Sequence, residues 1–133
     1  MPSQRVYALT ICAYRKEGMS EDDYHSYLSE HHAKLVKTHL VKAGIVSYTM
    51  THNTTETKQM LQQIFGHFPE GHTASYDCFI QIIFKDVKDY IRVKDDPYYQ
   101  DVIFPDHVNF ADPARTVFVT GWVETHIADG LLT

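Results

Sequence analysis

Hydrophobic and polar residues alternate along four segments of the chain, and this alternation predicts four β-strands. The segments span residues 6–14, 45–53, 76–84 and 115–124. Each is rich in β-branched or aromatic residues and is closed by charged or turn-forming residues. The third segment is the most apolar of the four, which indicates a central strand of a sheet.

A long helical period follows the first strand. Ser20 precedes three acidic residues, which is the pattern of a helix N-cap followed by a first turn that favours negative charge. Apolar residues then recur every three or four positions up to Ala43, and Gly44 supplies a stop. The pattern predicts an amphipathic helix over residues 21–43 that packs on the sheet.

Shorter helical periods occupy the rest of the chain. Residues 55–65 predict a short helix, and the loop that follows, residues 67–75, contains proline and glycine and is a candidate for a mobile lid. Asp86 stands where it would cap another short helix, which residues 95–97 interrupt with two aspartates and a proline. Residues 98–113 mix aromatic residues, acids and prolines, which predicts a short helix and a loop.

The order of these elements predicts the fold class. Two β-α-β units with a helical insertion between them form the split β-α-β arrangement of ferredoxin-like α+β domains. The 133 residues and 15.4 kDa fit one such domain, spanning 1–133. Because the helices suffice for only one face of the sheet, we expect its other face to carry Tyr, Ile, Phe or Trp side chains. We expect that face to pair in a homodimer, with the active cavity between each sheet and its helices.

Charge, apolar runs and cysteine positions exclude several classes of function. Seventeen Asp and Glu against twelve scattered Lys and Arg give a net charge of −5, so nucleic acid is not an expected partner. No apolar run approaches the ~20 residues that span a bilayer, and the N-terminus lacks an apolar signal core, which predicts a cytoplasmic protein without a membrane partner. Cys12 and Cys78 lie within strand-like runs and are interpreted as small core residues.

Motifs of common cofactor and metal chemistry do not occur in the sequence. There is no G-x-S-x-G, P-loop or dinucleotide fingerprint, so neither nucleophilic hydrolysis nor nucleotide chemistry has support. Neighbouring histidines such as His31 and His32 diverge by about 100° on a helix and no H-E-x-x-H spacing occurs, so we expect no dedicated metal site. Nine His, nine Tyr and seven Phe instead suit a pocket for a flat, hydroxylated molecule.

Several motifs are recognisable as a set. They are Arg15-Lys16-Glu17-Gly18-Met19-Ser20, Tyr24-His25-x-Tyr27-x-x-Glu30-x-His32-Ala33-x-Leu35, Gly44-Ile45-x-x-Tyr48-Thr49, Pro105-Asp106-His107-x-Asn109-Phe110-x-Asp112, Arg115-Thr116 and Gly121-Trp122. Together they resemble the EthD-type domain, a dimeric α+β barrel, and most of all its small fungal members found with polyketide pathways. The likeness covers nearly the whole chain. Lys34 is a departure, since the family usually has a proline there.

The resemblance implies a reaction class. The subgroup decarboxylates aromatic polyketide carboxylic acids of the atrochrysone type, which implies a cofactor-free lyase of fungal secondary metabolism. Relatives of this barrel also serve as polyketide cyclases, dehydratases or cofactor-free anthrone oxygenases, and these activities remain alternatives. A non-catalytic protein that binds an aromatic ligand is an alternative of a different class.

Two histidines are the first candidates for catalysis. His32 lies on the apolar side of the long helix, and the family motif favours a role in protonating or orienting a substrate oxygen. The alternative is a core histidine that bonds a backbone carbonyl. His107 lies in an irregular segment and is the expected proton donor, with Asp106 or Asp112 fixing its tautomer. The alternative for His107 is an exposed loop histidine without a partner.

His52 is the third candidate catalytic residue. It shares a strand face with Tyr48, about 13 Å away at ~3.3 Å per residue, and that spacing suits the two ends of a multi-ring substrate. The alternative is a strand-end histidine that caps the following turn, and His25 and His31 are weaker candidates. The aromatic residues expected to bind the substrate rings are Tyr48, Phe79, Tyr90, Tyr98, Tyr99 and Trp122.

A second alignment gives one of these aromatic residues another role. The plant relative olivetolic acid cyclase has a His-Pro-x-His segment, which is similar either to Pro105-Asp106-His107 or to Asp96-Pro97-Tyr98-Tyr99. In the second register Tyr99 replaces the catalytic histidine.

Overall fold

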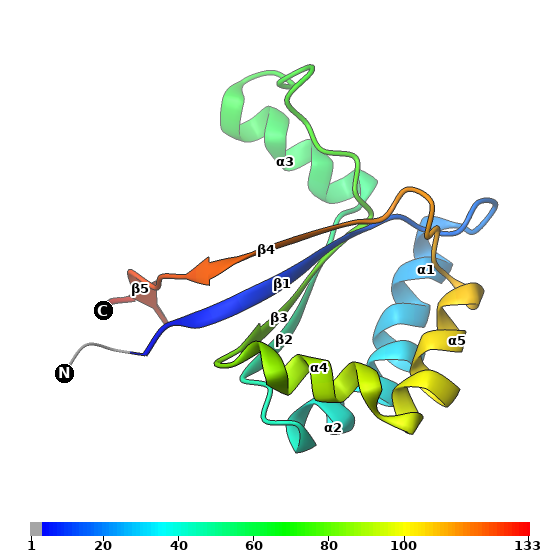
Figure 1. The fold of residues 1–133 in the computed structure, drawn as a ribbon. Helices are drawn as coiled ribbons and strands as arrows, with labels where there is room; N and C mark the ends of the chain where they lie inside the picture. The colour runs from blue at the N-terminus through cyan, green and yellow to red at the C-terminus, as the bar shows by residue number, and fades with distance from the viewer. Residues whose placement is uncertain (1–3) are drawn as a thin grey trace.

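Four antiparallel strands form the main sheet in the computed structural model, which describes residues 4–133. They are β1 (Val6–Ala13), β2 (Ser47–His52), β3 (Cys78–Phe84) and β4 (Val117–Val123). Their order across the sheet is β2-β3-β1-β4, so β3 is a central strand, as predicted (Figure 1). The ferredoxin-like α+β fold is confirmed.

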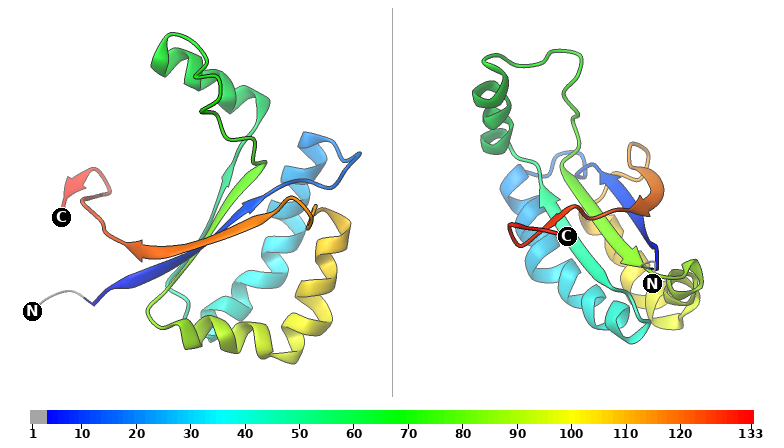
Figure 2. Two further views of the ribbon diagram at one scale, coloured as in Figure 1. Left: turned by 45° about the horizontal axis from the view of Figure 1, so that its top comes forward. Right: turned by 90° about the vertical axis from the view of Figure 1, so that its left-hand side faces the viewer.

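A layer of helices covers one face of this sheet (Figures 1 and 2). It consists of α1 (Glu21–Tyr27), η1 (Leu28–His32), α2 (Ala33–Lys42), α4 (Val87–Asp95), η2 (Tyr99–Ile103), α5 (Phe104–Asp106) and η3 (His107–Asn109). Ser20 caps α1 by accepting the Asp23 N–H, and Asp86 caps α4 by accepting the Lys88 N–H. Both caps agree with the prediction.

The predicted long helix is continuous from α1 to α2 but contains one irregular turn. In η1, a π-helical turn, the Ala33 N–H bonds to the Leu28 carbonyl five residues back. Lys34, which replaces the usual proline, lies in the first turn of α2. A second π-helical turn is η2. Such wide turns are common at functional sites, and both of these border the cavity described below.

The core lies between the sheet and the helices. Every second residue of β3 is buried against the helical layer, as strand geometry requires. The two buried clusters comprise Ala13, Tyr24, Leu28, Cys78, Ile80 and Phe110, and Val36, Leu40, Val93 and Ile103. Cys12 and Cys78 are free and buried, as expected, but only Cys78 belongs to these clusters, because Cys12 points to the other face of the sheet.

The other face of the sheet differs from the expectation. The strand register places on it Val6, Ala8, Thr10, Cys12, Ser47, Thr49, Thr51, Phe79, Gln81, Ile83, Val117, Val119, Gly121 and Val123. Only Phe79 and Ile83 belong to the large residue types that were predicted, and none of the set is charged. Tyr7 and Trp122 stand on the helix side instead, because each strand position fixes which face its side chain meets.

Two appendages extend from the sheet. The helix α3 (Thr55–Phe65) has the predicted bounds, and Gly66 ends it with a left-handed φ of 77°. It lies on the side of the sheet opposite the other helices (Figure 1). After β4 the chain forms a small hairpin of β5 (Ile127–Ala128) and β6 (Leu131–Leu132), which the sequence pattern did not predict.

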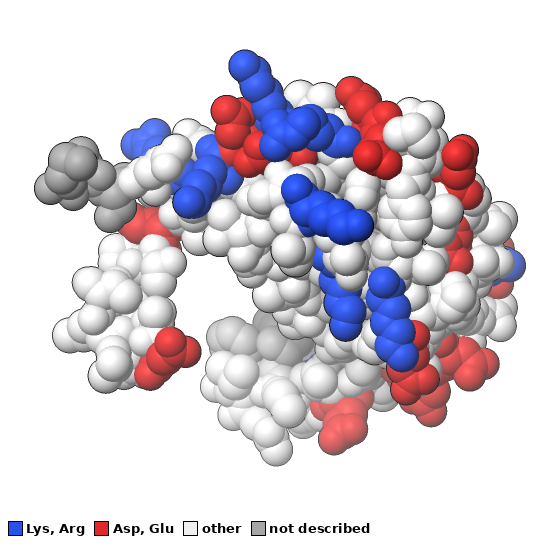
Figure 3. Space-filling model, turned by 90° about the horizontal axis from the view of Figure 1, so that it is seen from below, with Lys and Arg blue, Asp and Glu red and all other residues white. Residues whose placement is uncertain are grey.

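Two properties of the described residues are the hydropathy of the helices and the distribution of charge on one face of the molecule. Within residues 4–133 no helix has the length and apolar character needed to cross a bilayer. Seen from below, Lys and Arg lie mainly over the upper and middle part of this face, and Asp and Glu lie mostly around its margin (Figure 3).

Candidate active site

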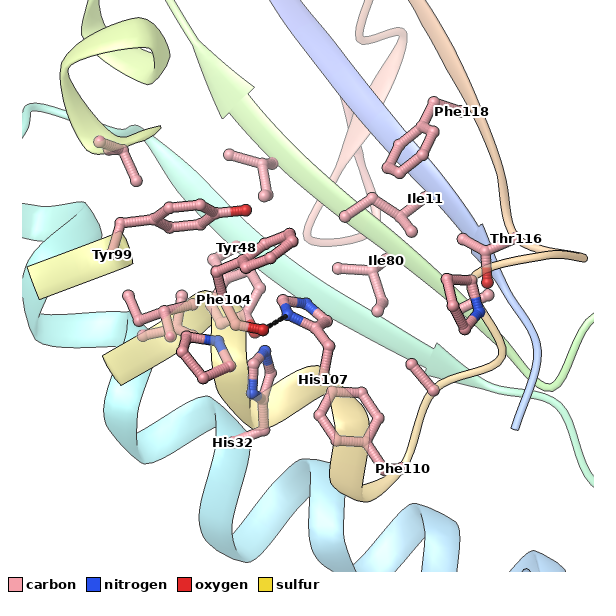
Figure 4. A pocket seen from close by; sticks show the side chains of 18 of the residues that line it. Ile11, His32, Tyr48, Ile80, Tyr99, Phe104, His107, Phe110, Thr116 and Phe118 are labelled. Carbon is pink, nitrogen blue, oxygen red and sulfur yellow. Dashed lines mark hydrogen bonds between the residues drawn. The ribbon is translucent and has the colours of Figure 1, made fainter. Parts of the chain in front are cut away.

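A cavity of about 610 Å³ lies between the sheet and the helical layer, where the sequence predicted the active cavity (Figure 4). Its lining comes from β1, β2, β3 and β4 on one side and from the helices and the segment 103–116 on the other. Most lining side chains are apolar, among them Ile11, Ile80, Ile82, Phe104, Phe110 and Phe118. This size and character suit a ligand of several rings.

His32 lines the cavity and is buried at the end of η1. Its Nδ1 donates a hydrogen bond of 2.8 Å to Oδ2 of Asp106. Because a carboxylate can only accept, Nδ1 carries the proton and the neutral ring keeps a free lone pair on Nε2. Burial lowers the pKa of His32 and outweighs the opposing hydrogen bond to Asp106. At neutral pH, His32 is therefore a neutral base with a fixed tautomer.

Asp106 is buried in α5 and gathers several hydrogen-bond donors. The Tyr27 hydroxyl and the Asn109 amide, at 3.0 Å, both donate to Oδ1. Nε2 of His31 also lies 3.5 Å from Oδ1. Burial opposes ionisation, but the bonds from Tyr27, His32 and Asn109 prevail and hold the pKa of this carboxyl below its usual value. The carboxylate is thus available to stabilise a positive charge on His32.

His107 in η3 stands beside His32 in the cavity, with 4.9 Å between the ring centroids. Its Nδ1 donates to the Phe104 carbonyl at 2.9 Å (Figure 4). The other ring nitrogen, Nε2, takes no part in this hydrogen bond. The prediction that Asp106 or Asp112 orients His107 is wrong. Asp106 bonds His32, and the Asp112 carboxylate accepts the Ala114 N–H instead. The helical path from α5 to η3 brings the ring within reach of a carbonyl three residues back.

Three predicted aromatic residues also line the cavity, and each brings a hydroxyl. They are Tyr48 from β2, Tyr90 from α4 and Tyr99 from η2. Burial raises the pKa of all three phenols, so each remains a neutral group that can donate a hydrogen bond. Figure 4 shows no hydrogen bond from Tyr48 or Tyr99 to the other side chains drawn. These hydroxyls are suited to bind carbonyl or phenol oxygens of a ligand.

His52 does not line the cavity, contrary to its predicted place on the cavity wall. Its Nδ1 lies 2.7 Å from Nδ1 of His25, and its Nε2 lies 3.3 Å from the Ser29 hydroxyl. His25 donates from Nε2 to the Asn53 carbonyl at 3.1 Å. His52 and Tyr48 do share a strand face, as predicted. However, α1 covers the His52 end of β2 and fills that space with His25.

Three other predicted aromatic residues also lie outside the cavity. Phe79 belongs to the open face of the sheet. Trp122 is half exposed, and the Arg5 guanidinium lies 4.6 Å from the centre of its ring. Tyr98 donates to the Leu35 carbonyl at 2.8 Å and joins two helical segments. The loop 67–75 does not line the cavity either, so its predicted role as a lid is not supported by its position.

Sequence reasoning missed the pairing of Asp106 with His32. The signal available was the motif Pro105-Asp106-His107, which showed a carboxylate next to a candidate base but not its direction. The arrangement offers a neutral imidazole backed by a carboxylate, a second imidazole and several phenols in one apolar space. Such a set can move protons and stabilise an oxyanion. Among residues 4–133 there is no group of three or more His, Cys, Asp or Glu placed to hold a metal ion.

The sheet and its helical layer place the chain among the ferredoxin-like α+β proteins, and the sequence identifies its family. The model of the EthD domain matches residues 16–114, so the chain belongs to the EthD domain family. The chain is 46% identical to the dehydratase aurZ of Gibberella zeae, over 94% of this chain and 82% of that protein. It is 43% identical to the decarboxylase nsrE of Aspergillus novofumigatus, over 95% and 83% respectively.

Solved structures agree on the fold. An EthD-like protein of Ralstonia eutropha superposes with a TM-score of 0.58 at 17% identity, over 92% of this chain and 93% of that one. A dimeric ferredoxin-like protein of Bacteroides fragilis gives a TM-score of 0.58 at 8% identity, over 90% and 96%. The names of the fungal relatives agree with the expected enzyme class, because decarboxylases and dehydratases are both lyases.

Proposed function

We propose that the protein removes the carboxyl group of an aromatic polyketide carboxylic acid as CO₂, without a cofactor, in the cytoplasm of a fungus. The observation that carries the proposal is the His32–Asp106 pair, which stands beside His107 inside an apolar cavity of about 610 Å³. The names of several fungal relatives, including the decarboxylase nsrE, support the reaction class. The phenols of the lining support a flat, oxygenated substrate.

The reaction needs one proton and a place for one electron pair. The bond between the ring carbon and the carboxylate breaks, CO₂ leaves, and the electron pair moves onto a neighbouring carbonyl to form an enolate. Protonated His107 then delivers its Nε2 proton to the ring carbon that lost the carboxylate. The carboxylate has left as CO₂, and a C–H bond replaces the broken C–C bond. Solvent returns a proton to His107. The half-buried position of this ring gives solvent access for that step.

The remaining polar groups hold the oxygens of the substrate. Nε2 of His32 accepts a hydrogen bond from a substrate hydroxyl, and the adjacent Asp106 stabilises the positive charge if the proton transfers. The neutral hydroxyl of Tyr99 donates to the developing enolate, whereas the hydroxyl of Tyr48 binds another oxygen in substrate and product alike. His52 has no part in this scheme, because it bonds His25 and Ser29 outside the cavity.

Dehydration is the second candidate, favoured by the 46% identity to the dehydratase aurZ. The same pair of imidazoles would serve it. His32 would take a proton from carbon, and His107 would give a proton to the departing hydroxyl, which leaves as water. The carboxyl group would then remain on the product.

We further propose that the protein is a homodimer that pairs through the open face of its sheet. That face lacks charged residues and is not covered by the helices of its own layer (Figure 2). A sheet face of this kind is usually covered by another layer. The dimeric neighbour from Bacteroides fragilis has the same fold.

The test is to incubate chelator-treated protein with atrochrysone carboxylic acid and to measure CO₂ and the organic products. The proposal predicts CO₂ release above the no-protein rate. His107→Ala should lose this activity, whereas the control His126→Ala should keep it. His126 is an exposed histidine beside Glu124 and is not among the residues that line the cavity. Unchanged substrate rejects the decarboxylase, and loss of water with the carboxyl retained supports the dehydratase.

A further inference from the structure

The helix α3 carries an apolar stripe that the described chain leaves largely in solvent. Met60, Ile64 and Phe65 are 53%, 71% and 55% exposed, and α3 has no buried residue. Residues four apart lie on the same side of a helix, so Met60 and Ile64 are neighbours, as are Leu61 and Phe65. The other residues of α3 are polar, among them Glu56, Lys58 and the glutamines at 59, 62 and 63. The helix is therefore amphipathic, with its apolar side in solvent.

Hydrogen bonds fix the N-terminal end of α3, although its apolar side is largely exposed. Glu21 accepts hydrogen bonds from the Thr55 N–H at 2.6 Å and the Thr55 hydroxyl at 3.2 Å. Thr54 and Thr57 form a reciprocal cap at the N-terminus, and Gly66 closes the C-terminus. Caps alone rarely maintain a helix of eleven residues in water, because helices this short depend on tertiary packing. We infer that another surface normally covers the stripe.

The position of α3 indicates which surface that is. The helix stands on the same side of the sheet as the open, uncharged face, while the other helices lie on the opposite side (Figures 1 and 2). A second sheet laid on the open face therefore comes alongside α3. We propose that α3 is an arm that packs its apolar stripe against the second copy of the chain, an inference that rests on the proposed homodimer.

The area of the sheet supports this assignment. Four strands about 4.8 Å apart and seven residues long at ~3.3 Å each give the open face roughly 440 Å² in projection. Stable interfaces bury about 800 Å² of accessible surface per partner, and the arm adds contact area to what the sheet face supplies. An eleven-residue helix adds roughly 160 Å². In a two-fold dimer each protomer gives one arm and receives one, so the projected contact area per protomer rises from roughly 440 to about 760 Å².

The first experiment measures dimer dissociation by sedimentation equilibrium for wild type, Ile64→Gln with Phe65→Gln, and the control Gln59→Ala. None of these side chains is buried in the protomer, so all three proteins are expected to fold, and circular dichroism checks this. The arm contact predicts that the double variant weakens the dimer by about 100-fold or more, since four large apolar side chains per dimer lose their burial. The control is expected to stay within about twofold.

The second experiment locates the arm directly. A nitroxide is attached to Met60→Cys in unlabelled protein, which is mixed with ¹⁵N-labelled wild type so that enhanced relaxation reports only contacts between copies. Enhancement at amides of the partner supports the arm. A dimer with unchanged affinity in the double variant and no enhancement overturns the arm while the sheet dimer stands. A monomer at all concentrations overturns both, whereas the decarboxylase proposal is tested separately by CO₂ release.

Discussion

Replacing Asp106 by Asn tests whether the carboxylate sets the protonation of His32. Three donors converge on this side chain: Tyr27 and Asn109 on Oδ1, and His32 on Oδ2. An amide has one oxygen and one NH₂ group. If the oxygen takes the place of Oδ1 and keeps its two donors, the NH₂ group faces His32. Nδ1 of His32 must then accept, which moves the ring proton to Nε2.

The size of the effect follows from what Nε2 does. With the proton on Nε2, His32 can no longer accept from the substrate, and no carboxylate remains to stabilise a positive ring. Loss of a positioned base or of its tautomer typically costs 10²–10⁴ in rate. We expect kcat to fall by about 100-fold or more, which corresponds to about 2.7 kcal/mol in the barrier. Product affinity should fall by no more than about 13-fold, because the shape of the cavity is kept and only one hydrogen bond, worth ~0.5–1.5 kcal/mol, is lost.

The assay is steady-state decarboxylation with product binding measured on the same preparations. The matched control is Asp112→Asn, since the Asp112 carboxylate caps the Ala114 N–H in a turn and does not contact either cavity histidine. The control should keep kcat within about twofold. A kcat within twofold of wild type for Asp106→Asn, in a protein that is folded, would refute the assigned role of the pair.

Four further predictions concern other residues of the account. His107→Ala should lower kcat by about 100-fold, whereas His52→Gln should leave kcat within about threefold, as single-turnover and steady-state assays can compare. Tyr48→Phe should weaken product binding by about 2- to 13-fold with little change in kcat, because one hydrogen bond worth ~0.5–1.5 kcal/mol is lost, and isothermal calorimetry measures this. Tyr24→Phe should leave stability unchanged or raise it by about 1 kcal/mol in urea unfolding, since the buried Tyr24 hydroxyl has no partner among the described residues. His32 has a lower pKa in the folded chain than its unfolded value of ~6.5, so the unfolded state binds this proton more readily and stability should fall as pH drops below about 6.5. His32→Gln should flatten that part of a urea-midpoint profile, and an unchanged slope would contradict it.

Local signals explain why the sequence predicts most of the fold. The serine and aspartate caps, the glycine at position 66 and the two hydrophobic periods depend on neighbours within a few residues, and each led to the observed element. The π-helical turn η1 was not predicted because its hydrogen bonding differs from an α-helix without changing the apolar pattern much. The short β5–β6 hairpin has too few residues for a period to show.

The site was only partly predictable, because its pairs join distant parts of the chain. Asp106 and His32 are separated by 74 positions, and only the packing of α5 against η1 shows that they meet. Likewise, Tyr48 and His52 share a strand face, yet one meets the cavity and the other meets His25 from α1. Residue type and spacing indicated an imidazole cavity, whereas the partner of each imidazole depends on tertiary structure.

The crystal structure of the protein with the decarboxylated product bound tests the central claim most directly. The account predicts that the aromatic rings lie between the sheet and the helices, with product atoms within about 3.5 Å of Nε2 of both His32 and His107. Oxygens of the product should also meet the hydroxyl of Tyr48 or Tyr99. A product bound on the open face of the sheet, or beside the His25–His52 pair, would contradict it.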